Sequence, residues 1–234
     1  MANRVSTTPI IALDVPNAED ALETVEYFGD LCRFYKVGNE LFTAAGPAIV
    51  RAIRAHGCDV FLDLKFHDIP NTVAGGVRNA AAMGARLVTV HASGGRAMLD
   101  AAVAAAGPAC GVLAVTVLTS LGEKDLADAW GRADLDVSAE VMRLADMAAA
   151  SGAHGIVCSG HEARAVHDRC GDQLAVLVPG IRAASGATDD QARVATPEGV
   201  AAAGARYAVV GRMVTAAKDR RAAMEQVNAA FGRR

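Results

Sequence analysis

The sequence predicts an α/β fold, a (β/α)8 TIM barrel, formed by a single domain over residues 1–234. Short runs rich in Val, Ile and Leu alternate with longer alanine-rich segments of helical periodicity along the whole chain. There are eight such runs, and no linker or low-complexity segment separates them. Eight strand and helix pairs in a domain of this length are typical of the barrel, whereas a doubly wound open sheet is the alternative architecture.

The candidate strands are apolar throughout rather than alternating in polarity, as expected for strands that are buried on both faces. We expect strands at residues 9–15, 33–38, 59–65, 86–92, 111–118, 155–159, 174–181 and 207–211. We expect helices to begin near Ala18, Ala44, Thr72, Arg96, Ser138, Glu162, Pro197 and Asp219. Several of these helices open at a capping residue and close at a glycine. The longest irregular segments are residues 119–138 and 182–198.

Composition argues against several classes of protein. The chain is 52% hydrophobic and 21% charged with a formal net charge of -3, as in an ordinary globular protein. It has no block of Lys and Arg with interleaved aromatic residues, so we expect neither nucleic acid nor a membrane surface as a partner. Five cysteines without a C-x-x-C pair indicate neither a zinc ribbon nor a disulfide framework. Because no apolar leader or 18-residue apolar run is present, the predicted location is the cytoplasm.

Polar side chains gather at the predicted carboxyl ends of the strands, which is where barrel enzymes carry their chemistry. Asp14 is expected to end the first strand, Lys36 the second and Thr119 the fifth. Asp63 and Lys65 are expected to end the third. Side chains from these positions should therefore converge at one mouth of the barrel.

The third strand runs into the charged segment FLDLKFHDIPNTV, residues 61–73. Because side chains alternate along a strand, Asp63 and Lys65 should share the inward face while Leu64 points toward the helices. An unpaired charge in the barrel interior is costly, so both must pair with each other, with Lys36 or with a bound group. A buried ion pair that only plugs the barrel is the non-catalytic interpretation. The full charged array favours a functional site, because apolar residues would fill the same volume at less cost; it comprises Asp14, Lys36, Asp63, Lys65 and Asp68.

Eight short motifs follow one another over nearly the whole chain. They are ALDVP (12–16), YKVG (35–38), FLDLKFHDIPNTV (61–73), HASGG (91–95), VTVLTS (115–120), PGIR (179–182), the region of Gln191, and VVGR (209–212). In content and order they resemble the orotidine 5'-phosphate decarboxylases. The core D-x-K-x-x-D also occurs in phosphosugar decarboxylases and synthases with the same barrel, but DLKFHDIPNT is far more specific. Asn39 departs from the family pattern, which has an apolar residue there, usually Met, and it could change the packing beside Lys36.

The resemblance implies a decarboxylase that removes carbon dioxide from C6 of the pyrimidine of orotidine 5'-phosphate. The product is uridine 5'-phosphate, formed in the last step of de novo UMP synthesis, with neither a metal nor an organic cofactor. Lys65 is then the general acid that protonates C6, and Asp63 holds Lys65 beside the substrate carboxylate. Lys36, Asp63, Lys65 and Asp68 form an alternating charge network in which Asp68 comes from the other subunit of a homodimer.

The resemblance also implies the remaining substrate contacts. Asp14 accepts a hydrogen bond from the ribose and Lys36 donates one, although a helix cap or turn residue is an equally good interpretation of Asp14 from the sequence alone. Thr119 contacts the pyrimidine. The residues expected to bind the phosphate, directly or through a closing loop, are Arg182, Gly211, Arg212 and Gln191. The residues expected to reach the neighbouring site together with Asp68 are Ile69 and Thr72.

Three other functions remain open from the sequence. A metal-dependent phosphosugar enzyme would use the carboxylates to hold Mg²⁺. A Schiff-base aldolase would use Lys65 as the nucleophile, but neighbouring carboxylates favour its protonated, non-nucleophilic form. A nucleotide-binding barrel without catalysis is the third alternative. His67 and His91 are interpreted as structural hydrogen-bonding residues, and no histidine spacing indicates a metal site.

Overall fold

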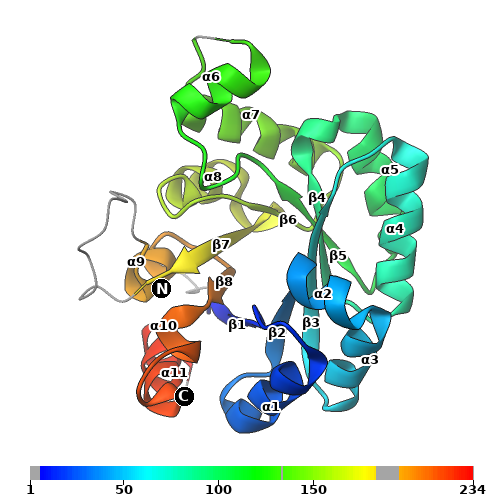
Figure 1. Ribbon diagram of the computed structural model, residues 1–234. Coiled ribbons are helices and arrows are strands. Elements are labelled where there is room, and N and C mark those ends of the chain that lie inside the picture. Colours follow the sequence, from blue (N-terminus) through cyan, green and yellow to red (C-terminus); the bar gives the residue numbers. More distant parts are fainter. Residues whose placement is uncertain (1–5, 133, 183–194, 234) are drawn as a thin grey trace.

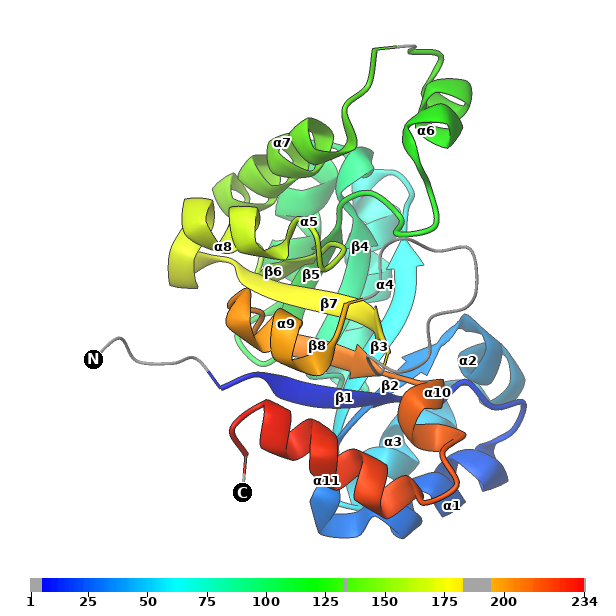
Figure 2. The same ribbon diagram turned by 90° about the vertical axis from the view of Figure 1, so that its left-hand side faces the viewer.

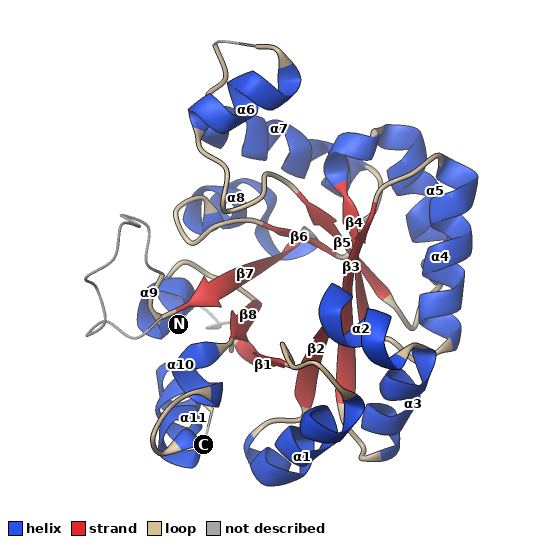
Figure 3. Ribbon diagram, in the orientation of Figure 1, coloured by secondary structure: helices blue, strands red, loops and turns tan. Residues whose placement is uncertain are grey.

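The protein forms a closed barrel of eight parallel strands, numbered in chain order around the barrel. The computed structural model describes residues 6–132, 134–182 and 195–233. Strand β1 (Thr8–Ala12) pairs with β8 (Tyr207–Val210) and closes the sheet (Figures 1 and 3). The predicted (β/α)8 barrel is therefore confirmed, and the open-sheet alternative is wrong because every strand has two neighbours. A single domain over all of residues 1–234 stays a prediction.

Helices surround the barrel and follow its strands in sequence (Figure 3). The remaining strands are β2 (Phe34–Gly38), β3 (Asp59–Phe66), β4 (Leu87–His91), β5 (Gly111–Val115), β6 (Gly155–Val157) and β7 (Ala175–Ile181). The α-helices are α1 (Ala18–Phe28), α2 (Asn39–Ala45), α3 (Pro47–Ala55), α4 (Pro70–Ala82), α5 (Arg96–Ala106), α6 (Glu123–Trp130), α7 (Val137–Ala150), α8 (Ala163–Cys170), α9 (Pro197–Ala202), α10 (Arg212–Thr215) and α11 (Arg220–Ala230). Each predicted strand and helix is present, within a few residues of its expected position.

The predicted strands end too late at several places, most clearly in β5. The apolar run continues to Leu118, whereas β5 ends at Val115. Val117 is still buried, and the hydroxyl of Thr116 donates to the carbonyl of Val157 at 2.8 Å. Apolar residues beyond the last ladder pair thus continue to pack in the core, so hydrophobicity alone overestimates the strand length.

Helix α6 lies in the segment 119–138 that was expected to be irregular. It projects away from the barrel in Figures 1 and 2, and Leu126 is its single buried residue. A helix of eight residues with so small an apolar face leaves little periodic signal in the sequence. None of the helices in the described ranges is both long and apolar enough to cross a membrane.

Two apolar cores stabilise the barrel, one between the sheet and the helices and one inside the strands. The inner core takes residues from all eight strands: Ile10, Ala12, Phe34, Phe61, Leu87, Leu113, Val115, Val157, Ala175, Leu177, Tyr207 and Val209. On β2, β3 and β4 the inner-core residues Phe34, Phe61 and Leu87 lie near the amino ends of the strands. The apolar core therefore leaves the carboxyl ends of these three strands for polar groups.

Four of the five cysteines are buried, and all five are free thiols. Burial raises the pKa of both Cys32 and Cys110 to about 11, because a thiolate in an apolar environment is poorly solvated. These two thiols consequently remain protonated near neutral pH, and they behave as small apolar core residues.

Candidate active site

The inward faces of β3 and β4 change from apolar to polar toward the carboxyl ends of these strands. On β3 the inner-core residue Phe61 is followed two positions later by Asp63. On β4 Leu87 is followed in the same way by Thr89. Because side chains two positions apart share a face, the polar residues continue the inner core upward. Polar side chains at the barrel mouth thus lie directly above the apolar residues of the inner core.

Asp63 and Lys65 form an ion pair at the end of β3. The Nζ of Lys65 lies 2.9 Å from both carboxylate oxygens of Asp63. The Asp63 side chain is 14% exposed and that of Lys65 is 32% exposed. Leu64 packs against the core between the sheet and the helices. The predicted opposite directions of Leu64 and the charged pair are confirmed.

The strand is nevertheless irregular at this pair. Leu62 pairs with Val88 and Phe66 with Val90, so the register shifts between these positions. Lys65 has a φ of 51° and is the one residue other than glycine with positive φ in the described ranges. Simple alternation therefore placed the two charges correctly but missed the bulge that presents Lys65.

Thr89 contacts both Lys65 and Asp63, and the sequence interpretation missed it. It is fully buried on β4, and its Oγ1 accepts a hydrogen bond from the backbone N–H of Lys65 at 2.9 Å. The same oxygen lies 2.9 Å from Oδ1 of Asp63. A signal was available, because a polar residue interrupts an otherwise apolar strand at the inward position. That signal is weak, since threonine is an ordinary strand residue.

A second ion pair connects β2 with the segment after β1. The Nζ of Lys36 lies 2.9 Å from Oδ1 of Asp14, and the Lys36 side chain is only 13% exposed. A β-carbon at Gly38 would lie 2.9 Å from Lys36 Nζ, so a larger residue at this position would require the ammonium to move. Asn17, not Asp14, caps α1, which makes the helix-cap interpretation of Asp14 wrong.

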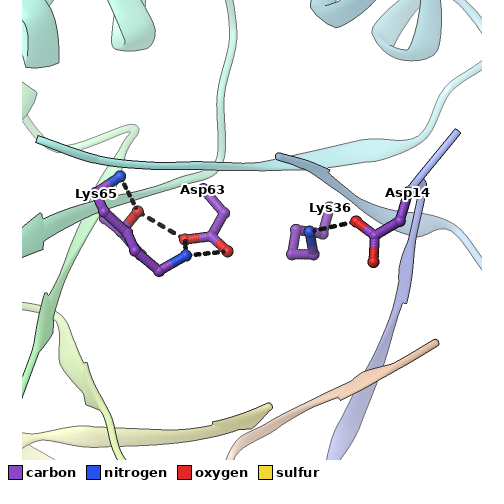
Figure 4. A network of polar contacts seen from close by, with 5 residues as sticks. Asp14, Lys36, Asp63 and Lys65 are labelled. Atoms are coloured by element: carbon purple, nitrogen blue, oxygen red, sulfur yellow. Dashed lines mark hydrogen bonds and ion pairs between the residues drawn. The ribbon is translucent and has the colours of Figure 1, made fainter. Parts of the chain in front are cut away.

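Figure 4 shows how the two pairs lie relative to each other. Lys65, Asp63, Lys36 and Asp14 follow one another around the barrel, with Asp63 between the two lysines (Figure 4). Positive and negative groups therefore alternate. Neither Asp14 nor Lys36 ends its strand as predicted, because β1 stops at Ala12 and Lys36 lies in the middle of β2.

A cavity of about 670 Å³ opens at this end of the barrel. Its size falls within the range of small-molecule sites. It brings together six of the predicted substrate-binding residues from well-separated parts of the chain: Asp14, Lys36, Thr119, Arg182, Gly211 and Arg212. Arg182 directly follows β7, and Arg212 is the first residue of α10 after β8. Thr119 lies in the turn beyond β5 rather than at the strand end.

Asp63 and Lys65 are not among the residues that line this cavity, and neither are three predicted residues of the loop after β3. Asp68, Ile69 and Thr72 are all exposed, and Ile69 is 66% exposed although it is apolar. Asp68 accepts a hydrogen bond from the N–H of Ile69 at 2.6 Å. The single chain thus leaves these side chains away from its own pocket. Gln191, the predicted loop residue above the phosphate, lies outside the described residues.

The rings of His67 and His91 pack against each other in a tilted arrangement. Their ring centroids are 5.2 Å apart, and no hydrogen bond of either imidazole is found among the described residues. Burial lowers the pKa of His91, and the nearby His67 and Lys65 lower it further. Asn39, the departure from the family pattern, is the exposed first residue of α2, so it takes no part in the core beside Lys36.

The comparisons with known proteins agree with this geometry. The model of the Orotidine 5'-phosphate decarboxylase / HUMPS family matches residues 7–227. The chain belongs to this family. A curated orotidine 5'-phosphate decarboxylase of Anaeromyxobacter sp. (strain K) is 51% identical over 218 residues, covering 93% of this chain and 95% of the relative. One from Laribacter hongkongensis (strain HLHK9) is 46% identical over 96% of this chain and 93% of its own length.

Solved structures show the same family relationship. The crystal structure of orotidine 5'-phosphate decarboxylase from Lactobacillus acidophilus matches with a TM-score of 0.84 and 37% identity. The match covers 96% of this chain and 99% of that one. The family therefore extends over the whole barrel, including both ion pairs and the cavity.

Proposed function

We propose that the protein is an orotidine 5'-phosphate decarboxylase, a carbon–carbon lyase that forms uridine 5'-phosphate in the last step of de novo UMP synthesis. The observation that carries the proposal is the ammonium of Lys65, held by both oxygens of Asp63 at the barrel mouth. The relatives named above, which match nearly the whole chain, support the same activity. We place the enzyme in the cytoplasm.

The chemical difficulty of the reaction explains why a fixed ammonium is needed. Loss of carbon dioxide from C6 leaves an electron pair on a ring carbon that has no good electron sink. A cation aimed at C6 stabilises this developing charge, and a preorganised charge does so without reorganising solvent. Lys65 then transfers its proton to C6 as the general acid. This scheme requires no metal and no organic cofactor.

Asp63 serves this step by holding Lys65. Both of its oxygens face the ammonium, so a Mg²⁺ ion at this carboxylate would have to displace Lys65. In the described part of the chain, no three His, Cys, Asp or Glu side chains are grouped to hold a metal ion. Asp63 would also lie near the carboxylate that leaves, and their repulsion favours its departure. Stabilisation of the transition state by Lys65 is the larger contribution that we assign.

The residues that line the cavity can bind the phosphate, the ribose and the pyrimidine of the substrate. Arg182 and Arg212 flank the side of the cavity near β7 and β8, where an arginine fork can bind two phosphate oxygens. Gly211 lets the backbone approach the anion. Asp14 and Lys36 lie where they can hydrogen-bond the ribose, and Thr119 faces the same space for the pyrimidine. Gln191 would close over the phosphate and the ring.

The exposed loop after β3 supports a homodimer with shared sites. Asp68, Ile69 and Thr72 are exposed and do not line the cavity of their own chain, and Ile69 leaves a large apolar side chain in water. A second subunit would cover Ile69 and receive Asp68 beside its own Lys65. The charge network would then contain Lys36, Asp63 and Lys65 of one subunit and the neighbouring Asp68.

The decisive experiment is incubation of the purified protein with orotidine 5'-phosphate in the presence of a chelator. We expect loss of the ultraviolet absorbance of the pyrimidine carboxylate, with uridine 5'-phosphate as the product. Activity that requires added Mg²⁺ would instead favour a metal-dependent phosphosugar enzyme. Binding of the nucleotide without turnover would favour a non-catalytic barrel, and trapping by borohydride would indicate a Schiff base.

A further inference from the structure

We infer that Thr89 is a positioning residue that holds both members of the Lys65–Asp63 pair through one hydroxyl group. It fixes the backbone at Lys65 and orients the carboxylate of Asp63. The structural part of this inference is independent of any reaction, whereas its effect on catalysis rests on the proposed decarboxylase function.

The pairing between β3 and β4 creates the need for such a group. Leu62 is opposite Val88 and Phe66 is opposite Val90, so four steps along β3 correspond to two steps along β4. The three residues 63–65 therefore face the single residue Thr89. A regular ladder cannot pair this excess, so the backbone groups of the bulge need other partners.

Lys65 has the conformation that most requires support. Its φ of 51° belongs to the left-handed region, which residues with a β-carbon rarely adopt. Its backbone N–H donates to Oγ1 of Thr89 at 2.9 Å in place of a carbonyl acceptor on β4. The hydroxyl thus supplies the acceptor that the shifted ladder does not.

The direction of the second hydrogen bond follows from the chemistry of a hydroxyl. An ionised carboxylate can only accept, so the single proton of Thr89 is donated to Oδ1 of Asp63 at 2.9 Å. Asp63 in turn accepts from Nζ of Lys65 through both oxygens. A chain of hydrogen bonds results, which runs from the backbone amide of Lys65 through Thr89 and Asp63 to the ammonium of the same Lys65.

Two other buried threonines, Thr7 and Thr116, form hydrogen bonds of a different kind from those of Thr89. Thr7 donates to the carbonyl of Ala205 at 2.8 Å, and Thr116 donates to the carbonyl of Val157 at 2.8 Å. Both hydroxyls join backbone segments without contacting a charged side chain. Thr89 instead connects the backbone of the bulge to a charged carboxylate. A threonine that only stabilises the fold would not need this contact with a charged side chain. Thr7 provides a matched control at the opposite end of the barrel.

The test compares T89V, T89S and T7V by hydrogen exchange at the Lys65 amide and by steady-state kinetics. In T89V we expect faster exchange at Lys65 and a kcat that falls roughly 10- to 100-fold, since a small displacement of the reacting group is enough for such a loss. KM should change less than about two-fold, because the phosphate contacts lie elsewhere. T89S should restore most of kcat, and T7V should leave kcat and the Lys65 exchange unchanged.

Several outcomes would overturn the inference. It fails if the Lys65 amide of T89V remains as protected as in the wild type, or if T89S is no better than T89V. It also fails if T89V keeps its kcat in an active enzyme. If T89V does not fold, T89A removes the hydroxyl without replacing it and carries the same comparison. A wild-type protein that does not convert orotidine 5'-phosphate would disprove the proposed function. Hydrogen exchange would then still show whether Thr89 protects the backbone amide of Lys65.

Discussion

The two ends of the barrel carry cavities of similar size but different chemistry. The cavity at the carboxyl ends of the strands has a volume of about 670 Å³, and the one at the amino ends has about 520 Å³. Both contain arginine side chains. Only the first contains residues that the sequence predicted for substrate binding. Size therefore does not distinguish the site, whereas the position of polar residues along the strands does.

The charges at the amino end are bonded in a way that stabilises the fold. Arg54 donates to the carbonyl of Cys58 at 3.0 Å and forms an ion pair with Asp59, the first residue of β3. The Nε2 of His154 lies 3.0 Å from the hydroxyl of Tyr207. These partners belong to the loops and strand starts themselves. At the carboxyl end, by contrast, the ion pair of Lys36 and Asp14 lines the open cavity, and the pair of Lys65 and Asp63 lies next to it (Figure 4).

The largest expected effect is the loss of activity when the cation at the carboxyl end of the barrel is removed. Lys65→Ala removes both the cation and the proton donor, so kcat should fall by about 10⁴-fold or more. Arg86→Ala, an exposed charge in the cavity at the amino end, is the matched control and should keep its kcat. Steady-state assays with orotidine 5'-phosphate measure both. Comparable losses in the two variants would mean that the two ends do not differ as proposed.

The second prediction tests whether the carboxyl-end site is shared between subunits. Lys65→Ala and Asp68→Asn should each be nearly inactive as homodimers. In a mixed dimer, one site would combine a wild-type Lys65 with a wild-type Asp68 of the other subunit. After unfolding and refolding together in equal amounts, the mixture should regain about a quarter of the wild-type activity, because half of the dimers are mixed and each has one complete site. If Asp68 acts in its own subunit, mixing restores nothing.

A smaller effect is expected at the phosphate side of the same cavity. Arg212→Ala should weaken substrate binding and turnover, with kcat/KM reduced about 10- to 100-fold, since a hydrogen bond to a charged group is lost. The effect should fall mainly on substrates that carry the phosphate. Comparison of orotidine 5'-phosphate with the unphosphorylated nucleoside measures this selectivity. An unchanged kcat/KM for the phosphorylated substrate would refute the role of Arg212.

The smallest effect concerns stability and involves one histidine at each end of the barrel. Burial lowers the pKa of His91 at the carboxyl end and of His154 at the amino end below the ordinary value of 6.5. In this direction the unfolded chain binds more protons, so the stabilisation is present above about pH 6.5 and is lost as the pH falls through the lowered values. His91→Asn and His154→Asn should each reduce the acid-induced decrease in Tm by about 1 °C.

Thermal unfolding followed by circular dichroism between about pH 5 and pH 8 measures this effect. The double variant should show the weakest dependence on pH. A double variant with the same pH dependence as the wild type would show that neither imidazole is linked to folding.

The predicted architecture depended on signals that lie within each element. Strands buried on both faces must be apolar, and helices that cover them need an apolar stripe and defined ends. Asp219 illustrates this, because it was expected to open a helix and its side chain accepts from the N–H of Ala222 as the cap of α11. Elements with weak local signals, such as α6 and the four-residue α10, were not anticipated.

The sequence by itself therefore determined the order of the elements and the gathering of charge near the carboxyl ends of the strands, whereas the pairing of β1 with β8 decided between a closed barrel and an open sheet. The sequence did so because burial, periodicity and strand polarity are properties of neighbouring residues. The register between β3 and β4, the left-handed backbone of Lys65 and the hydroxyl of Thr89 beside Asp63 were decided only by the tertiary structure. These features depend on contacts between residues 24 and 26 positions apart, which no local pattern records.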